Sequence, residues 1–273
     1  KTVTLDGGSG DDYLQAEGRV YKSSQWQYVQ NGKATLSGGE GNDRLNVNTY
    51  VSAELFGGKG NDHLWSNDGI INSRLFGEEG NDSLYANITN RWNQQIGVSS
   101  KEHRSAILNG GDGDDTLETY INGFYANYGS FTANSDGGDG NDSIRISGGN
   151  LVKGSINITG GEGTDNIEVT NWDAGRTNQK TSDQGFRKVV IDSGADDDTI
   201  TVQGSLNTSI TTGSGSDTIR LTAHQYRTQQ QGKRNIYDAN GSTSGTQNAD
   251  PITITDFTTG EGGDILDYSD LLK

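Results

Sequence analysis

Gly38-Gly39-Glu40-Gly41-Asn42-Asp43-Arg44-Leu45-Asn46, GGEGNDRLN in one-letter code, decides the fold because the chain returns to it repeatedly. Close copies begin at Gly7, Gly57, Gly77, Gly110, Gly137 and Gly160. Degenerate copies begin at Ser193, Thr212 and Thr259. The shared pattern is G-G-x-G-x-D-x-U-x, in which U is a large aliphatic residue, and its residues are numbered below as positions one to nine. Self-similarity of this kind predicts a repetitive architecture in which one structural unit is stacked on the next.

Every copy combines a glycine-rich backbone with one acidic side chain. Glycines at positions one, two and four permit positive φ and let backbone carbonyls turn toward one point. A carboxylate at position six completes the hard-oxygen shell that Ca²⁺ prefers. Zinc is a poor alternative, since the chain has no cysteine and three scattered histidines. The position-six residues are Asp12, Asp43, Asp62, Asp82, Asp115, Asp142, Asp165, Asp198, Asp217 and Asp264.

The predicted metal ligands also include residues at the first four positions, which are expected to act through their carbonyls. These candidates are Gly8, Gly10, Gly38, Gly39, Glu40, Gly41, Gly57, Gly58, Lys59, Gly60, Gly77, Glu78, Glu79, Gly80, Gly110, Gly111, Asp112, Gly113, Gly137, Gly138, Asp139, Gly140, Gly160, Gly161, Glu162, Gly163, Gly194, Asp196, Gly213 and Gly215. Acidic pairs such as Asp114/Asp115 are interpreted as calcium ligands or solvated charge rather than as a catalytic couple.

Strand-like sequence flanks each turn. An aliphatic residue stands two positions before the first residue of most turns: Leu5, Leu36, Leu55, Leu75, Leu108, Ile158, Ile191 and Ile210. After the turn, apolar residues alternate with a period of two, as in Leu45/Val47 and Ile200/Val202. This alternation predicts strands with one inward face, so that the unit is strand, calcium turn, strand. Ser135 breaks the aliphatic rule, which predicts poorer packing in that coil.

The nonapeptide resembles that of the RTX (repeats-in-toxin) family, and the resemblance spans nearly all of the chain. It implies an all-β, right-handed parallel β-roll (β-solenoid) that binds calcium between successive turns. Both turns would supply carbonyls and their position-six aspartates. Ten turns leave nine gaps, and the irregular 47-residue gap is expected to be empty. About eight Ca²⁺ ions would then carry roughly +16, which offsets the formal charge of −16.

The spacing of the turns predicts where they lie. Nonapeptides follow one another directly in the familiar RTX β-roll, whereas first positions here are 19 to 47 residues apart. Each coil therefore carries one motif, so all calcium turns should stack on one side, with variable loops on the other. The expected organisation is a roll over 1–222, a long loop over 223–250, and a last coil over 251–273.

The composition and charge of the chain limit the classes of partner that it can bind. Hydrophobic residues make up 29% of the chain, and with a charge of −16 this predicts disorder when calcium is absent. The acidic balance argues against a nucleic-acid partner, which requires a basic face. No apolar run approaches the ~18 residues of a membrane span, so we expect no membrane insertion.

Aromatic residues gather in the long loops, where two interpretations stay open. They either cover the thin roll, in which case Trp26, Trp92 and Trp172 are buried, or they bind a surface glycan or protein. The candidate ligand-binding residues are Tyr120, Phe124, Tyr125, Tyr128 and Phe131, since aromatics crowd this segment most closely.

From Pro251 the sequence resembles the start of the C-terminal target region of type I secreted proteins. The residues that fit are Ile254, Asp256, Phe257, Asp264, Leu266, Asp267, Ser269, Asp270, Leu271 and Leu272. This version is common near the end of large bacterial RTX adhesins. It implies an extracellular, surface-associated adhesin segment that is exported by type I secretion machinery.

No catalytic motif is present, so the segment itself is predicted not to be an enzyme. The alternatives are an accessory module of a secreted protease, lipase or alginate epimerase, and a glycan-binding or ice-binding segment. Ice binding requires a regular rank of threonine and Asx side chains. Position three instead carries mixed and mostly charged residues: Ser9, Glu40, Lys59, Glu79, Asp112, Asp139 and Glu162.

Overall fold

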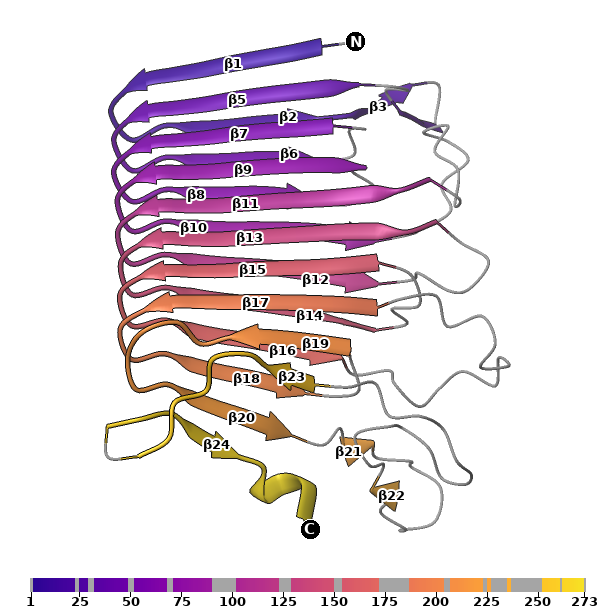
Figure 1. Ribbon diagram of the computed structural model, residues 1–273. Coiled ribbons are helices and arrows are strands. Elements are labelled where there is room, and N and C mark those ends of the chain that lie inside the picture. The colour runs from indigo at the N-terminus through magenta and orange to yellow at the C-terminus, as the bar shows by residue number, and fades with distance from the viewer. Residues whose placement is uncertain are drawn as a thin grey trace.

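The structure, a computed structural model, describes residues 2–22, 25–28, 32–48, 52–67, 71–89, 102–122, 129–149, 154–171, 187–203, 207–222, 225–226, 235–236, 252–260 and 262–272. Over these ranges the fold is all-β, with two ten-stranded parallel sheets that face each other (Figure 1). No helix in the described ranges has the length and apolar character of a membrane span.

The front sheet holds the strands that lead into the turns: β1 (Thr2–Ser9), β5 (Lys33–Glu40), β7 (Ser52–Lys59), β9 (Asn72–Glu79), β11 (Arg104–Asp112), β13 (Phe131–Asp139), β15 (Gly154–Glu162), β17 (Arg187–Ala195), β19 (Asn207–Thr211) and β23 (Ile252–Ile254). The back sheet holds the strands that leave them: β2 (Tyr13–Glu17), β6 (Arg44–Asn48), β8 (His63–Asn67), β10 (Ser83–Thr89), β12 (Thr116–Asn122), β14 (Ser143–Gly149), β16 (Asn166–Asn171), β18 (Thr199–Gln203), β20 (Thr218–Thr222) and β24 (Ile265–Asp267).

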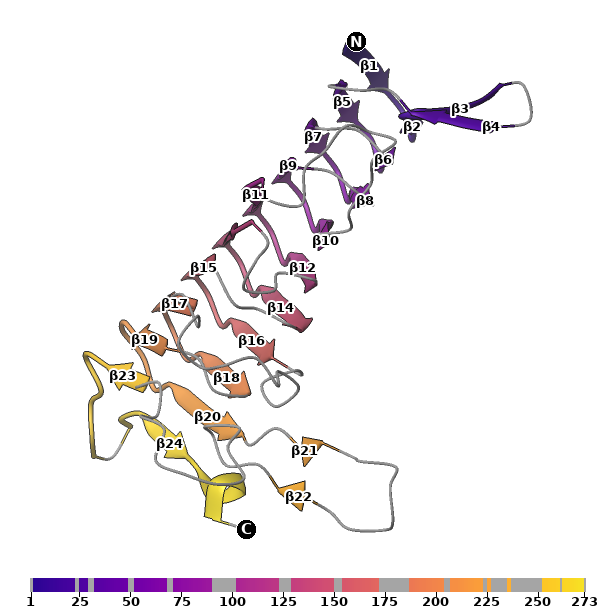
Figure 2. The same ribbon diagram turned by 90° about the vertical axis from the view of Figure 1, so that its right-hand side faces the viewer.

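Four short strands and one helical turn complete the described structure: β3 (Arg19–Lys22), β4 (Gln25–Tyr28), β21 (Gln225–Tyr226), β22 (Asn235–Ile236) and η3 (Ser269–Leu272). β3 pairs with β4 and β21 pairs with β22, both antiparallel. These two hairpins project from the loop-bearing edge of the roll (Figure 2).

The roll is a right-handed coil. In Figure 1 the front strands run leftward, the back strands run rightward behind them, and each coil lies below the one before it. Within the two large sheets, each described strand pairs with its counterparts in the neighbouring coils, as β5 pairs with β1 and β7. The predicted right-handed parallel β-roll is confirmed.

Glycine-rich turns occupy one edge of the roll. Each joins a front strand to the back strand of the same coil, and all lie along the left edge in Figure 1. Back strands end and the next front strands begin at the opposite edge, and the number of residues between them varies. The one-sided arrangement of turns predicted from their spacing is therefore confirmed.

The core is a thin double layer of aliphatic side chains between the sheets. The aliphatic residues expected before the turns are buried from Leu36 to Ile210, and only Leu5, in the first coil, is half-buried. After the turns, Leu45, Val47, Ile200 and Val202 are also buried. Full burial of one such side chain contributes about 1.5–3 kcal/mol. In each coil, each sheet contributes to the core only the inward-facing side chains of one strand. Hydrophobic burial alone therefore gives a modest core.

Ser135 occupies a core position that an aliphatic residue fills in most coils. It is 3% exposed, and its hydroxyl has no hydrogen-bond partner among the described residues. Removing an unsatisfied buried hydroxyl relieves about 1–3 kcal/mol of desolvation penalty. We therefore expect Ser135→Ala to raise the thermal unfolding temperature in saturating calcium.

Ser66→Ala is the matched control, because its hydroxyl is satisfied. Ser66 and Ser73 are both buried, and their Oγ atoms lie 2.6 Å apart in a hydrogen bond. Losing Ser66 leaves the Ser73 hydroxyl unpaired, so this variant should be destabilised. A drop in unfolding temperature for Ser135→Ala that matches the drop for Ser66→Ala would contradict this account.

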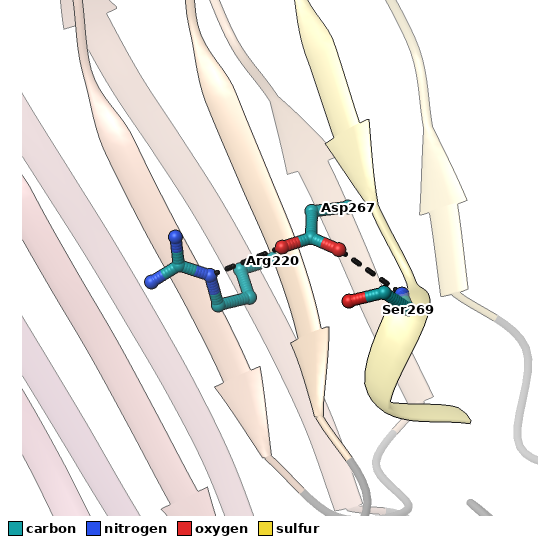
Figure 3. A network of polar contacts seen from close by, with 3 residues as sticks. All are labelled: Arg220, Asp267 and Ser269. Carbon is teal, nitrogen blue, oxygen red and sulfur yellow. Dashed lines mark hydrogen bonds and ion pairs between the residues drawn. The ribbon is translucent and has the colours of Figure 1, made fainter. Parts of the chain in front are cut away.

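The last coil closes the roll through polar contacts (Figure 3). Arg220 Nε on β20 donates to Oδ2 of Asp267 on β24 at 3.4 Å. The backbone N–H of Ser269 donates to Oδ1 of Asp267 at 3.0 Å, where η3 begins. This backbone donor holds the pKa of Asp267 below its usual range. Asp267 and Ser269 belong to the C-terminal pattern quoted above, and here they join η3 to the back sheet.

Candidate metal centre

Glycine is favoured at positions two and four because the turn backbone has positive φ there. Gly39 has φ of 113° and Gly41 has φ of 131°. A Cβ at Gly39 would also overlap the carbonyl oxygen of Gly8 in the preceding turn. Among the described residues, two that are not glycine adopt positive φ: Glu78 at 80° in a position two and Asp196 at 76° in a position four. An L-residue is strained in this region.

The position-six aspartates form a continuous hydrogen-bonded ladder. The backbone N–H of Asp43 donates to Oδ1 of Asp62 at 2.7 Å, and the N–H of Asp62 donates to Oδ1 of Asp82 at 2.7 Å. Nine such bonds, 2.6–3.1 Å long, link Asp12 to Asp264. From Asp43 to Asp217 these residues are at most 3% exposed. Each carboxylate is therefore oriented by the turn that precedes it.

In nine of these ten aspartates the second carboxylate oxygen has no hydrogen-bond partner among the described residues. Oδ2 is buried and unsatisfied in Asp12, Asp43, Asp62, Asp82, Asp115, Asp142, Asp165, Asp198 and Asp217. A native protein rarely buries a row of charged acceptors without donors or a cation. This row is the main observation that points to bound metal.

Backbone carbonyls converge on the same oxygens. A Cβ placed on Gly7 would lie 2.6 Å from both Oδ2 of Asp12 and the carbonyl oxygen of Gly38 in the next turn. The same overlap recurs at Gly38, with Oδ2 of Asp43 and the carbonyl of Gly57. Carboxylate and carbonyl oxygens from successive turns thus face one space beside each first glycine. Hard oxygens of this kind suit Ca²⁺.

The pairing between strands leaves the first position free for this role. Register passes from Ser37↔Phe56 directly to Gly39↔Gly58, so Gly38 and Gly57 are not paired. Carbonyls at positions three and six are used differently. For example, Lys59 accepts a hydrogen bond from the N–H of Gly41, and Asp43 accepts one from the N–H of His63, both at 2.8 Å.

No group of three or more His, Cys, Asp or Glu side chains that could hold a metal converges within the described residues. The turns do not depend on such a group, because a gap between turns offers two aspartates and could complete its oxygen shell with backbone carbonyls. The donor set therefore fits calcium and argues against zinc.

Burial raises the pKa of seven ladder aspartates, although the ladder N–H of the preceding turn acts in the opposite direction. The pKa rises to about 6 in Asp62, Asp142 and Asp198, and to about 7 in Asp82, Asp115 and Asp165. Neighbouring carboxylates add to the rise. Without a cation, the ionised ladder is therefore unfavourable near neutral pH. Calcium would supply the compensating charge, since it binds the deprotonated form.

Residues at position three were predicted to bind metal through their carbonyls rather than through their side chains. Glu40, Lys59, Glu79, Asp112, Asp139 and Glu162 are all exposed. Lys59 and Glu79 form a solvent-exposed ion pair with an N–O distance of 3.2 Å. Their carbonyls accept hydrogen bonds from the preceding turn, as that of Glu79 does from the N–H of Gly60 at 2.8 Å, so metal binding by these carbonyls stays a prediction.

The last gap differs from the others because protein groups already use the carboxylate of Asp264. Its Oδ1 accepts from the N–H of Asp217 at 3.1 Å, and its Oδ2 accepts from the N–H of Thr258 at 2.7 Å. Asp256 accepts from the N–H groups of Thr212 and Gly213 at 2.8 and 2.9 Å. Hydrogen bonds therefore hold the degenerate tenth turn in place.

A second ladder runs beside the first and was not predicted from the sequence. Oδ1 of Asn42 accepts from the N–H of Asn61 at 2.7 Å, and Oδ1 of Asn61 accepts from the N–H of Asn81 at 2.9 Å. This position-five ladder points in the opposite direction, since each side chain orients the turn that follows. The recurrence of Asn and Asp at position five is the sequence feature from which this ladder could have been predicted.

Of the candidate ligand-binding aromatics, two have described side chains. Phe131 is 2% exposed, and its ring packs where a Cβ on Gly154 would overlap it, so it is a core residue that offers no surface to a ligand. Tyr120 is half-buried, and its hydroxyl accepts a hydrogen bond from Asn122 Nδ2 at 3.2 Å. Outside the described residues lie Phe124, Tyr125, Tyr128, Trp92 and Trp172, together with the side chain of Trp26.

A family model described as "RTX calcium-binding nonapeptide repeat (4 copies)" matches residues 4–18, 30–48, 54–69, 72–90 and 107–119. The chain therefore carries RTX calcium-binding nonapeptide repeats. Turns from Gly137 onward lie beyond the matched residues but continue the same aspartate ladder. A comparison with curated proteins found no match.

Proposed function

We propose that this chain is a calcium-loaded structural segment of a secreted bacterial RTX adhesin, which folds after export and supports attachment of the cell to a surface. The row of buried Oδ2 atoms without donors carries the calcium part of the proposal. RTX repeats are typical of secreted proteins, and this supports an extracellular location, where calcium is plentiful. The resemblance of residues 251–273 to a type I secretion target region favours export by that machinery.

Eight gaps are proposed to hold calcium, from Asp12/Asp43 to Asp198/Asp217. In each of them both aspartates have an unsatisfied Oδ2. The ninth gap is proposed to be metal-free, because Thr258 already donates to Oδ2 of Asp264. Metal analysis of the calcium-saturated protein after gel filtration should therefore find about eight Ca²⁺ per chain. Finding one or two would contradict the proposal.

The adhesin role is tested separately from the metal. The competing proposal is an accessory module of a secreted enzyme, and domains encoded beside this segment distinguish the two. Long tandem immunoglobulin-like repeats favour an adhesin, whereas an adjoining catalytic domain favours the enzyme. Deletion of this segment from the parent protein should reduce calcium-dependent attachment of cells to surfaces. Unchanged attachment, with the parent still exported, would refute the adhesin role and leave the calcium assignment standing.

A further inference from the structure

A hollow on the outer face of the back sheet is independent of the calcium turns. It is open to solvent, has a volume of about 400 Å³, and is lined by Trp65, Asn67, Tyr85 and Glu118. Trp65, Tyr85 and Glu118 occupy position nine of three successive repeats and pair directly across β8, β10 and β12. Small-molecule sites usually occupy ~300–1,000 Å³, and this hollow falls within that range.

A rigid base supports these side chains. Each follows a core leucine, Leu64, Leu84 or Leu117, that is at most 1% exposed. Neighbouring strands lie ~4.8 Å apart, so the three position-nine side chains form a row about as long as two sugar rings. Trp65 is 46% exposed, which leaves part of its indole available for contact.

The combination of groups selects the ligand class. Two aromatic rings offer flat apolar surfaces with a negative face, which suit the C–H faces of a pyranose ring. The Glu118 carboxylate can accept hydrogen bonds from two neighbouring hydroxyls, and the Asn67 amide both donates and accepts. An apolar partner would leave both polar groups unused. A cation would use the rings and the carboxylate, but would leave the amide donors of Asn67 unpaired.

From this arrangement we propose that the Trp65–Glu118 hollow binds a saccharide unit. One pyranose ring lies against Trp65 and Tyr85, while Glu118 and Asn67 bind its hydroxyls. The site requires the folded roll. It does not require the adhesin assignment, so either can fail without the other.

Saturation-transfer NMR on the calcium-loaded protein tests the proposal. The probes are glucose, galactose, mannose, N-acetylglucosamine and N-acetylneuraminic acid in the millimolar range, with tetramethylammonium as the cationic alternative. At least one sugar should receive saturation. Trp65→Ala should abolish the signal, and Glu118→Gln, which preserves shape, should weaken binding by about tenfold.

Two variants on the same sheet serve as controls. Tyr13→Ala removes an aromatic ring that is 64% exposed but does not line the hollow. Glu168→Gln changes another position-nine carboxylate, which pairs with Arg145 at 3.6 Å. Both controls should keep full sugar binding, and all variants should keep the calcium-induced β-sheet circular dichroism.

Three results would overturn the saccharide site. One is a blank sugar panel with folded protein, and another is equal sugar binding in Trp65→Ala and Tyr13→Ala. The third is a response to tetramethylammonium without any response to sugars, which would assign the hollow to cationic ligands instead.

Discussion

Chelation of calcium with EDTA at about pH 7.5 is expected to abolish the β-sheet circular dichroism of this chain, and millimolar calcium is expected to restore it. Above their raised pKa values, ladder aspartates such as Asp82 and Asp115 are ionised, and each of these has a buried Oδ2 without a hydrogen-bond donor. The thin core cannot compensate for this charge together with the backbone entropy of the glycine-rich turns. A chain that keeps the same spectrum in EDTA would refute calcium-dependent folding.

The same spectra at lower pH identify the carboxylates as the cause. In the metal-free roll the pKa of six ladder aspartates, Asp62 and Asp82 among them, is about 6 to 7, whereas an unfolded aspartate has a pKa near ~3.9. The folded form therefore binds more protons than the unfolded form between these values. Its stability is present at low pH and is lost as pH rises through about 6 to 7.

We therefore expect the EDTA-treated chain to regain part of its β structure at about pH 5.5. Sodium chloride at matched ionic strength is the control for simple screening of surface charge. Identical spectra at the two pH values would show that the buried aspartates do not govern the metal-free state.

Asp62→Ala is expected to be far more damaging than Asp217→Ala. Asp62 lies between two complete turns, and its loss removes a carboxylate from two adjacent gaps. It also leaves the buried N–H of Asp43 without its 2.7 Å acceptor. Loss of a hydrogen bond to a charged acceptor alone lowers the free energy of unfolding by about 1.5–3 kcal/mol. A defect in the centre of a repeat array also separates the coils on its two sides. Asp217 borders only one proposed calcium gap, because hydrogen bonds hold the gap that follows.

The measurement is the calcium concentration at the midpoint of folding for each variant. Asp62→Asn is the matched control, since the amide keeps an oxygen acceptor for the Asp43 N–H but removes the negative charge. It should lie between the wild type and Asp62→Ala. Equal midpoint shifts for Asp62→Ala and Asp217→Ala would count against stacked, mutually dependent sites.

The repeat predicted the β-roll because the residue type at each key position meets one physical requirement of that fold. Glycine at Gly39 follows from positive φ and close stacking, the apolar pair Leu45/Val47 follows from a buried strand face, and Asp43 follows from the need for hard oxygen ligands. The spacing of the turns predicted that they would share one edge. Ser135 was recognised as an exception, and the structure places its hydroxyl in the core without a partner.

The remaining features depend on contacts between coils, which a single repeat does not encode. Nothing in one nonapeptide shows that Oδ1 of Asp62 is taken by the preceding turn while Oδ2 is left for metal. The residue at position nine faces solvent and differs from repeat to repeat. The adjacency of Trp65 and Tyr85 is therefore recognised only when the register between neighbouring coils is known. Phe131 looked like a loop aromatic, but it begins a front strand and fills the core.

Stacking in single file also determines how the roll would respond to mechanical load. Strands lie across the long axis, so tension between the two ends would detach coils one at a time rather than shear a whole sheet. From Asp12 to Asp217, successive ladder aspartates are separated by 19 to 33 residues of chain. Each detachment would release roughly 65 to 115 Å of extended chain. A tether of this kind lengthens in steps and dissipates work under sudden pulls, and calcium concentration would set the force at which each step begins.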